Sequence, residues 1–437
     1  MLEPTWSQDC EHLSYGMLKE LVSEVPKSQE TIALHGGLPP EECFPIAQIQ
    51  LTLHNGEVVD VPASMCQQQY NVSAYGYEPL RAWCEAHTKS SHGRPDSHRT
   101  MVTSSTTHAL EMLTSLLLNP EDSILVEEYT YSHFVECVVE RKGYQVIPVK
   151  LDDDGIVPGT LERSIEQIGC LSSGEENGGQ VNRQMPRLLY MIPTGQNPTG
   201  SCLPEQRRRE IYRICSKYNI FIIEDDPYHY VQYALDSDQQ PGAHNLASHS
   251  LLPYDVDGRV IRLDSFAKFL APGFRLGWAT ASPYIIEKLA MQIQSLTLGA
   301  NMMSQGIVWS ILDNWGDDGL DSYLLKMQEL YSSKAKVLLE ALDTYMRGIA
   351  VWGTPKAGMF LWVKIKCVNN CTMELTRKLR QKGIVVLPGY ILQSNQRDKS
   401  PCPYLRISFS YASHESLTKG VKRMSEYLRA SKLCINA

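Results

Sequence analysis

The chain has 437 residues, of which 43% are hydrophobic and 21% are charged, and its formal net charge is −8 at pH 7. This composition is typical of a globular protein, and the length suggests two or three domains. The acidic balance argues against non-specific nucleic-acid binding, and no apolar run reaches the ~20 residues that would span a bilayer.

The first residues include Glu3, Asp9 and Glu11 and contain no apolar leader core, which argues against a secretory or transit peptide. The twelve cysteines are scattered and form no C-x-x-C pair, and the closest histidine pairs are five residues apart. These spacings indicate reduced thiols and no metal site. We therefore expect a cytoplasmic protein that binds neither nucleic acid nor membranes.

Strand-like apolar runs alternate with helical patterns between residues 101 and 277. Residues 101–110 read as a strand that enters a helix, and residues 204–218 read as a helix with Pro204 in its first turn. The other strand candidates are residues 123–126, 188–192, 220–223 and 260–263. This alternation predicts βαβ units and a mostly parallel sheet.

The pattern changes in the last third of the chain. A long helical stretch at residues 320–346 precedes strand-like runs at 359–365, 383–387 and 404–409. This order predicts a smaller α+β domain after the parallel sheet. The predicted division is 1–60 for an N-terminal arm with part of the small domain, 61–325 for the large domain and 326–437 for the C-terminal small domain.

A lysine, a hydroxyl and a guanidinium follow the run at 260–263. Ser265 and Lys268 belong to one Ser-Phe-Ala-Lys segment, and Arg275 comes seven residues after the lysine. A lysine forms a Schiff base with an aldehyde, whereas a hydroxyl and an arginine can hold a phosphate. Pyridoxal 5′-phosphate (PLP) carries both groups, so the segment predicts a PLP enzyme with Lys268 as the attachment point.

An acidic partner for the pyridine nitrogen of PLP occurs at the end of the run at 220–223. Ligands bind beyond the carboxyl ends of parallel strands, so Asp225 is expected to face the cofactor. The adjacent Asp226 is the alternative partner for the ring nitrogen. The run at 188–192 leads in the same way into a turn that contains Asn197. On local sequence alone, Asn197 is equally consistent with a plain Asn-Pro turn.

Six segments in chain order resemble the fold-type I, class I/II family of PLP-dependent aminotransferases, and most of all its aromatic, α-aminoadipate and kynurenine aminotransferase branch. They are His35-Gly36-Gly37-Leu38-Pro39 and residues 193–200, 224–228, 265–277, 355–362 and 404–410. The resemblance covers nearly the whole chain. It implies an α/β fold of the PLP-dependent transferase type, with a large PLP-binding domain built on a mostly parallel sheet and a smaller α+β domain.

The resemblance implies a catalytic role for three residues near the cofactor ring. Lys268 would hold PLP and move the substrate proton, Asp225 would pair with the ring nitrogen, and Tyr228 would reach the phenolic oxygen. Asn197 would reach the same oxygen, and Tyr131 would stack on the ring. Tyr129 is a rival for the stacking position, and a plain core tyrosine is nearly as consistent with the sequence.

The phosphate is expected to contact Thr106, Thr107, Ser265 and Arg275, and Tyr70 would reach it from the second subunit of a homodimer. The sequence departs from the family pattern in this region. Ser105 stands where the family usually has glycine, Thr106 and Thr107 stand where it often has serine and glutamine, and Ala267 replaces a frequent serine. The spacing from Tyr70 to Gly76 is one residue longer than usual.

For the substrate, the resemblance implies that Arg406 grips the α-carboxylate, with Gly37 and Asn197 beside it. A planar guanidinium suits a carboxylate because it offers two parallel hydrogen bonds. A structural ion pair is the alternative interpretation of Arg406.

The implied activity is exchange of an amino group between an aromatic or long-chain L-amino acid and a 2-oxo acid. A PLP-dependent carbon–sulfur β-lyase would use the same residues, so the sequence leaves that alternative open. A PLP-binding transcription regulator would need an N-terminal DNA-binding domain, and it is less consistent because only residues 1–30 precede Thr31 and they are not basic.

Overall fold

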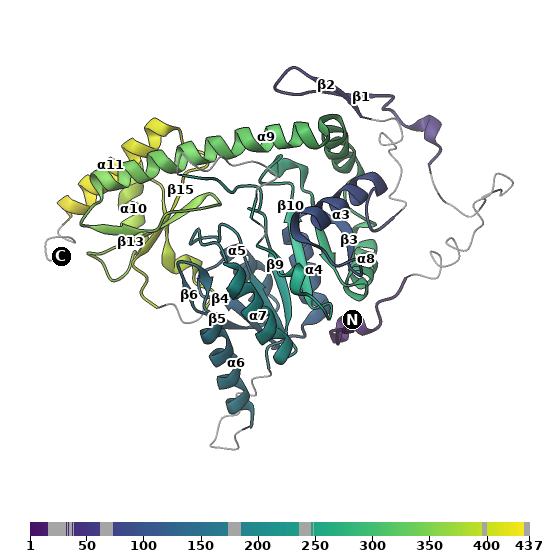
Figure 1. Ribbon diagram of the computed structural model, residues 1–437, viewed down its shortest axis with the longest axis horizontal. Helices are drawn as coiled ribbons and strands as arrows, with labels where there is room; N and C mark the ends of the chain where they lie inside the picture. Colours follow the sequence, from purple (N-terminus) through teal and green to yellow (C-terminus); the bar gives the residue numbers. More distant parts are fainter. Residues whose placement is uncertain are drawn as a thin grey trace.

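The computed structural model describes residues 1–15, 32, 34, 37, 39–61, 73–173, 185–235, 246–247, 249–395 and 400–431. A seven-stranded sheet and a four-stranded sheet lie at opposite ends of one long helix, α9 (Figure 1). The helices that carry the argument are α1 (Gln8–Glu11), α3 (Glu78–His92), α4 (Thr106–Leu117), α5 (Ser132–Phe134), α6 (Pro158–Ser173), α7 (Glu205–Lys217), α8 (Pro283–Thr297), α9 (Met302–Tyr345), α10 (Met373–Gln381) and α11 (His414–Ala430).

The larger sheet has the strand order β3-β11-β10-β9-β8-β4-β5. Its strands are β3 (Arg99–Thr103), β4 (Ser123–Glu127), β5 (Gln145–Val149), β8 (Leu188–Met191), β9 (Phe221–Asp225), β10 (Val260–Ser265) and β11 (Gly277–Ala281). β11 is antiparallel to both of its neighbours, whereas β10, β9, β8, β4 and β5 pair in parallel. The predicted α/β fold with a mostly parallel sheet is confirmed.

Both faces of this sheet are covered, which explains why its strands read as almost continuous apolar runs. Leu189, Ile222 and Val260 pack in one cluster with buried residues of α6 and α7. Side chains from alternate positions, such as Leu188 and Ile223, pack in the opposite cluster with residues of α4 and α8. Successive side chains of a strand therefore pack into two different hydrophobic clusters, one on each face of the sheet.

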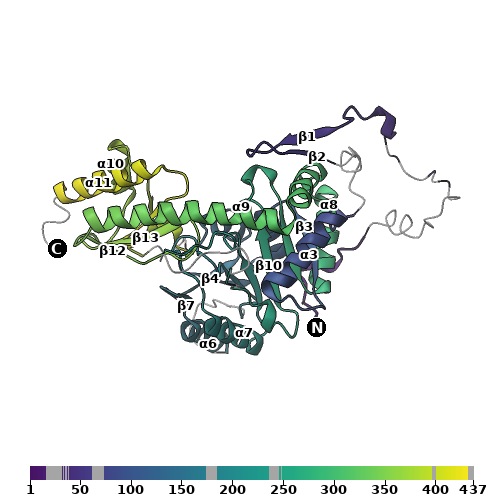
Figure 2. The same cartoon turned by 45° about the horizontal axis from the view of Figure 1, so that its top comes forward.

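The smaller sheet is antiparallel and has the order β12-β13-β15-β14. Its strands are β12 (Ala350–Trp352), β13 (Phe360–Ile365), β14 (Leu387–Pro388) and β15 (Tyr404–Ser408). One face packs in the core with α9, α10 and α11, whereas Phe360, Trp362 and Arg406 occupy the alternate positions. Figure 2 shows α9 running from this sheet to the helices of the larger one.

Two expectations for the C-terminal third need correction. The predicted strand at 383–387 is wrong for most of its length, because only Leu387 and Pro388 pair with β15. Gly383 forms the turn after α10 at φ +77°, and Val385 is exposed. The helix predicted at 320–346 begins much earlier, and α9 consists of two helical segments that meet at Gly316.

The N-terminal residues pack against the layer of α4 and α8. The Ser7 hydroxyl donates to the Ser115 carbonyl, and Lys288 of α8 donates to the Leu13 carbonyl over 2.8 Å. A hairpin of β1 (Ile49–Thr52) and β2 (Val58–Val61) projects from the body beside α9 (Figure 1). In the part of the chain that the structure describes, no helix combines the length and apolarity needed to cross a membrane.

Nine of the described cysteines are free, as the sequence predicts. Cys367 is an exception, because it is disulfide-bonded. The expectation that every thiol is reduced therefore needs correction at this residue.

A buried cluster of charges and histidines lies beside the end of β9. The Arg262 guanidinium is fully buried and pairs with Asp226 over 2.9 Å and with Asp264 over 2.7 Å. His92 and His229 meet edge to face, with ring centroids 4.4 Å apart. Burial lowers the pKa of both imidazoles well below its ordinary value, and the Arg262 charge adds to this effect.

The His229 imidazole therefore makes unfolding pH-dependent. It stays neutral in the folded protein and gains a proton in the unfolded chain below pH ~6.5, so the stability that depends on it decreases as the pH falls through that value. Between pH 7.5 and pH 5.5, this histidine should lower the free energy of unfolding by about 1.4 kcal/mol, since the loss is small above pH ~6.5 and grows by that amount per pH unit below it. We expect His229→Gln to remove this loss. Denaturant unfolding of variant and parent at both pH values measures the difference. Exposed His54→Gln is the control, and an equal pH effect in both variants would contradict the account.

Candidate active site

One cavity of about 160 Å³ lies at the carboxyl edge of the larger sheet. Nine of the twelve predicted site residues line it, although they come from five separate segments of the chain. They are Thr106, Thr107, Tyr131, Asn197, Asp225, Tyr228, Ser265, Lys268 and Arg275. The cavity forms here because β3, β4, β8, β9 and β10 all end at this edge.

Lys268 lies three residues beyond the end of β10 and is half-buried. Burial lowers the pKa of its amine, and the positive charges of Arg275 and Arg406 add to that effect, while Asp225 opposes it. A lysine amine with a lowered pKa is a better nucleophile and proton acceptor near neutral pH.

Asp225 is the last residue of β9 and is almost fully buried. Its Oδ2 accepts a 2.9 Å hydrogen bond from the Tyr190 hydroxyl, whereas its buried Oδ1 has no partner in the protein. Burial raises the pKa of Asp225 to about 7, and the hydrogen bond from Tyr190 opposes that increase. The rival Asp226 does not line the cavity, because its carboxylate pairs with Arg262 instead.

The N-terminus of α4 has features that suit an anion. Thr106 and Thr107 are the first two residues of this helix, where unpaired N–H groups and the helix dipole favour negative charge. Ser265 and Arg275 line the same cavity. Gly277 permits this approach, since a Cβ at that position would lie 2.5 Å from the Asp264 carbonyl and 3.4 Å from the Thr106 nitrogen.

Ser105 precedes this helix and also lines the cavity. Its φ of 121° and ψ of 163° fall in a region that is essentially restricted to glycine, and such strain costs on the order of 1–3 kcal/mol. The Ser105 hydroxyl accepts from the His108 amide over 3.3 Å and so caps the helix. The departure from the family's glycine is therefore accommodated with strain and a cap.

Arg406 of the smaller sheet does not itself line the cavity, but it contacts the cavity residue Asn197. Its guanidinium donates to Asn197 Oδ1 over 2.6 Å and lies over the Phe360 ring at 4.1 Å, while its buried Nε has no partner in the protein. Gly195 and Gly358 bring the two regions together, because a Cβ on Gly195 would lie 2.5 Å from the Gly358 nitrogen. The site therefore combines groups from both sheets.

The turn that carries Asn197 is held by a buried amide. Gln196 Nε2 donates to Glu127 over 2.9 Å and to the Tyr129 carbonyl over 2.7 Å, and its Oε1 accepts from Thr199. Burial raises the pKa of Glu127 to about 8, although its hydrogen bonds, of which that from Gln196 is the strongest, oppose this change. These contacts fix the end of β4 against the loop after β8.

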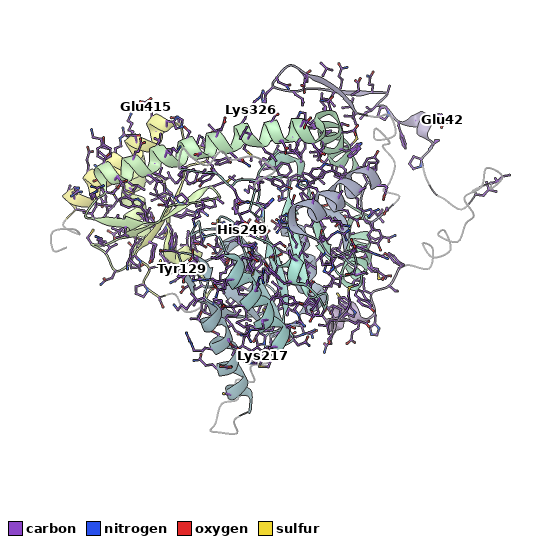
Figure 3. All side chains as sticks on the ribbon, in the orientation of Figure 1. Glu42, Tyr129, Lys217, His249, Lys326 and Glu415 are labelled. Carbon is purple, nitrogen blue, oxygen red and sulfur yellow. The ribbon has the colours of Figure 1, made fainter. Side chains whose placement is uncertain are left out.

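The two tyrosine rivals occupy different surroundings. Tyr131 lines the cavity, and Tyr228 meets the Phe360 ring edge to face at 6.0 Å. Tyr129 instead packs against Trp362, with ring centroids 5.2 Å apart, where the smaller sheet approaches the larger one (Figure 3). Only the Tyr131 position is compatible with stacking inside the cavity.

Two predicted residues are not brought to the cavity by the described contacts. Gly37 is exposed, and a Cβ at that position would meet no atom within 4 Å. Tyr70, together with His35, Gly36 and Leu38 of the first matched segment, lies outside the described residues.

The residues that line the cavity fit PLP. The unpartnered Asp225 Oδ1 suits a protonated ring nitrogen, the α4 terminus suits a phosphate, and Lys268 is available to bond an aldehyde. These three groups surround one small cavity, as a cofactor that carries all three functions requires.

The comparisons with known proteins agree with this geometry. Residues 82–424 match the family model described as aminotransferase class I and II. The chain belongs to this family. Accordingly, it is an enzyme that transfers amino groups between amino acids and 2-oxo acids, and PLP is its cofactor.

Individual aminotransferases match almost the full length of the chain. A bovine protein named kynurenine/alpha-aminoadipate aminotransferase, mitochondrial, is 32% identical over 95% of both chains. An aromatic amino acid aminotransferase of Dictyostelium discoideum is 30% identical and covers 93% of this chain and 84% of its own. The crystal structure of aminotransferase Aro8 from Candida albicans superposes with a TM-score of 0.84, at 26% identity over 97% of both chains.

Proposed function

We propose that this aminotransferase acts on aromatic or long-chain L-amino acids. The observation that carries the proposal is the contact of Arg406, on β15, with the cavity residue Asn197, to which its guanidinium donates a hydrogen bond. An α-carboxylate held there would place the substrate amine toward Lys268. The names of the relatives, which include kynurenine, α-aminoadipate and aromatic aminotransferases, support this range of side chains.

We propose that the cavity residues take the following roles. Lys268 attaches the cofactor and carries the substrate Cα proton, and Asp225 holds the proton on the ring nitrogen through Oδ1. Thr106, Thr107, Ser265 and Arg275 bind the phosphate. Bound in this way, PLP would withdraw electrons from the substrate Cα.

The remaining site residues orient the ring and the substrate. We propose that Tyr131 stacks on the ring, that Tyr228 and Asn197 bind its phenolic oxygen, and that Arg406 binds the substrate carboxylate. The roles of Gly37 at the substrate and of Tyr70 at the phosphate of a second subunit stay predictions.

The test of this function is a panel of L-phenylalanine, L-tyrosine, L-tryptophan, L-kynurenine, L-α-aminoadipate and L-alanine, each mixed with 2-oxoglutarate and the holoenzyme. Formation of glutamate with the first five and not with L-alanine would support the proposal. A preference for L-alanine would contradict it. An S-substituted L-cysteine carries a thiol leaving group at Cβ, so pyruvate and free ammonia formed from it without glutamate would instead indicate β-elimination.

We propose a homodimer with shared active sites. The projecting β1–β2 hairpin exposes Val58 and offers an edge for a second copy. Light scattering measures the mass directly, and a monomer at assay concentration would contradict the proposal. Mixing Tyr70→Phe with Lys268→Ala subunits then tests whether sites are shared, since only mixed dimers would regain a complete site.

We propose the division 1–60, 61–325 and 326–437 for the arm, the large domain and the small domain. The second boundary crosses α9, which continues from one sheet to the other. Limited proteolysis that separated the two sheets by cleavage far from these boundaries would contradict the division.

The cytoplasmic location stays a prediction. The bovine relative is named as mitochondrial, so microscopy of the tagged full chain is the test of this prediction.

Asp225→Asn should retain PLP but turn over slowly. The variant keeps the phosphate site and loses the negative charge beside the ring nitrogen. A hydrogen bond to a charged group contributes roughly 1.5–3 kcal/mol, so we expect kcat to fall roughly 10- to 150-fold. Cofactor content and single-turnover rates measure the two effects separately. Asp226→Asn is the matched control and should mainly lower stability, because Asp226 pairs with Arg262; an inactive, folded Asp226→Asn beside a normal Asp225→Asn would reverse the assignment.

A further inference from the structure

The Asp225 carboxylate is divided between two environments. One oxygen, Oδ2, is anchored by the Tyr190 hydroxyl at 2.9 Å, and the other, Oδ1, is buried without a protein partner in a residue that lines the cavity. Tyr190 itself is 0% exposed and does not line the cavity. Among the described residues that line the cavity, Asp225 is the one to which the Tyr190 hydroxyl donates a hydrogen bond.

The position of Tyr190 is fixed by the sheet and by one aromatic neighbour. Tyr190 lies on β8, opposite Ile223 of the adjacent parallel strand β9, so its side chain reaches the end of β9. Its ring packs on Phe134 of α5 with centroids 4.1 Å apart. These contacts hold the Tyr190 hydroxyl next to the Asp225 carboxylate. Because the donor is held in place, its hydrogen bond also restricts the rotation of the Asp225 carboxylate.

The charges around this pair show why a donor matters here. Burial favours the neutral form of Asp225, and the carboxylates of Asp226 and Asp264 add to that tendency, whereas Tyr190 and Lys268 oppose it. Burial also raises the pKa of Tyr190 well above its ordinary value, with Asp225, Glu127 and Tyr131 adding to the effect. The phenol therefore keeps its proton and donates a hydrogen bond to the carboxylate.

We propose that Tyr190 is a positioning residue that keeps Asp225 ionised and turns Oδ1 toward the ring nitrogen of the cofactor. The inference rests on the proposed role of Asp225 and adds the group that makes that role possible. Without the donor, burial would favour the neutral form of Asp225 more strongly, because the hydrogen bond from Tyr190 opposes that tendency. A neutral Asp225 would no longer supply the negative charge that would hold a proton on the ring nitrogen of bound PLP.

The test uses the holoenzyme loaded with PLP that carries ¹⁵N in the ring. In Tyr190→Phe we expect unchanged cofactor content, a ring ¹⁵N signal shifted toward the unprotonated position, and a kcat about tenfold lower, the order expected for one hydrogen bond to a charged group. Tyr144→Phe is the matched control, because it removes another buried tyrosine hydroxyl, which donates to the Thr114 carbonyl over 3.2 Å, away from the cavity. Its ¹⁵N signal and kcat should equal those of the parent.

A second variant covers the case in which Tyr190→Phe does not fold. 3-Fluorotyrosine at position 190 keeps the ring and makes the hydroxyl a stronger donor, so the ¹⁵N signal should remain at or beyond the protonated position of the parent. An unprotonated signal in this variant, or a protonated one in folded Tyr190→Phe, would overturn the inference. Asp225→Asn distinguishes the role of Asp225 from that of Tyr190. An unchanged ¹⁵N signal in Asp225→Asn would refute the role of Asp225 itself. A shifted signal in Asp225→Asn together with an unshifted signal in Tyr190→Phe would refute only the role of Tyr190.

Discussion

Lys268→Ala should abolish amino transfer while leaving the fold intact. The residue follows the end of β10, lines the cavity and has a half-buried amine. A positioned proton-transfer group contributes ~10²–10⁴-fold, and the same amine would also attach the cofactor, so we expect kcat to fall more than ~10⁴-fold. Rapid mixing of the holoenzyme with L-phenylalanine and 2-oxoglutarate measures the rate, and circular dichroism measures the fold.

The matched control is Lys288→Ala. Lys288 is also half-buried, but it lies on α8, does not line the cavity and donates to the Leu13 carbonyl. This variant should keep parental activity per bound cofactor, even where its unfolding temperature decreases. A fully active Lys268→Ala, or equal losses in both variants, would show that Lys268 is not the reactive amine.

Arg406→Ala should separate substrate binding from cofactor binding. Removing one partner of a buried, hydrogen-bonded charge pair costs ~2–5 kcal/mol, which corresponds to roughly 30- to 4,000-fold in kcat/KM for an α-amino acid. Cofactor content should not change, because Arg406 approaches from β15 and the phosphate site is built from α4 and β10. Steady-state rates with L-phenylalanine and absorbance of the bound cofactor measure the two properties.

Two comparisons sharpen the Arg406 test. 2-Phenylethylamine lacks the carboxylate, so its slow reaction should be nearly equal in parent and variant. Arg406→Lys keeps the positive charge but loses the planar guanidinium, so its kcat/KM for L-phenylalanine should lie between those of the parent and of Arg406→Ala. Loss of the cofactor in Arg406→Ala would assign the residue to folding, and an unchanged kcat/KM for L-phenylalanine would remove it from the substrate site.

The sequence predicted those parts of the site that follow from local pattern. Apolar runs that end in Asp225 or lead to Lys268 read as parallel strands, and parallel strands deliver their carboxyl ends to one edge. Those residues line the cavity together, as expected. The arrangement needed no knowledge of side-chain contacts, because the topology alone brings the ends together.

Partners across the fold could not be predicted in the same way. Tyr190 lies in an apolar strand and reads as a core residue, so nothing local indicates its bond to Asp225. Arg262 is similarly hidden in the run at 260–263, although its pairing is what takes Asp226 out of the cavity. The prediction of a strand at 383–387 was wrong for a related reason. An apolar run does not show how many of its residues pair with a neighbouring strand, and only Leu387 and Pro388 pair with β15.

We expect the cavity at the carboxyl edge of the larger sheet to hold PLP on Lys268. Borohydride reduction of the purified holoenzyme, followed by proteolysis and mass spectrometry of the modified peptides, identifies the lysine that carries the cofactor. The expected product is a single phosphopyridoxyl group on Lys268, and none in the Lys268→Ala variant. Attachment to any other lysine of the parent protein would show that this cavity is not the cofactor site.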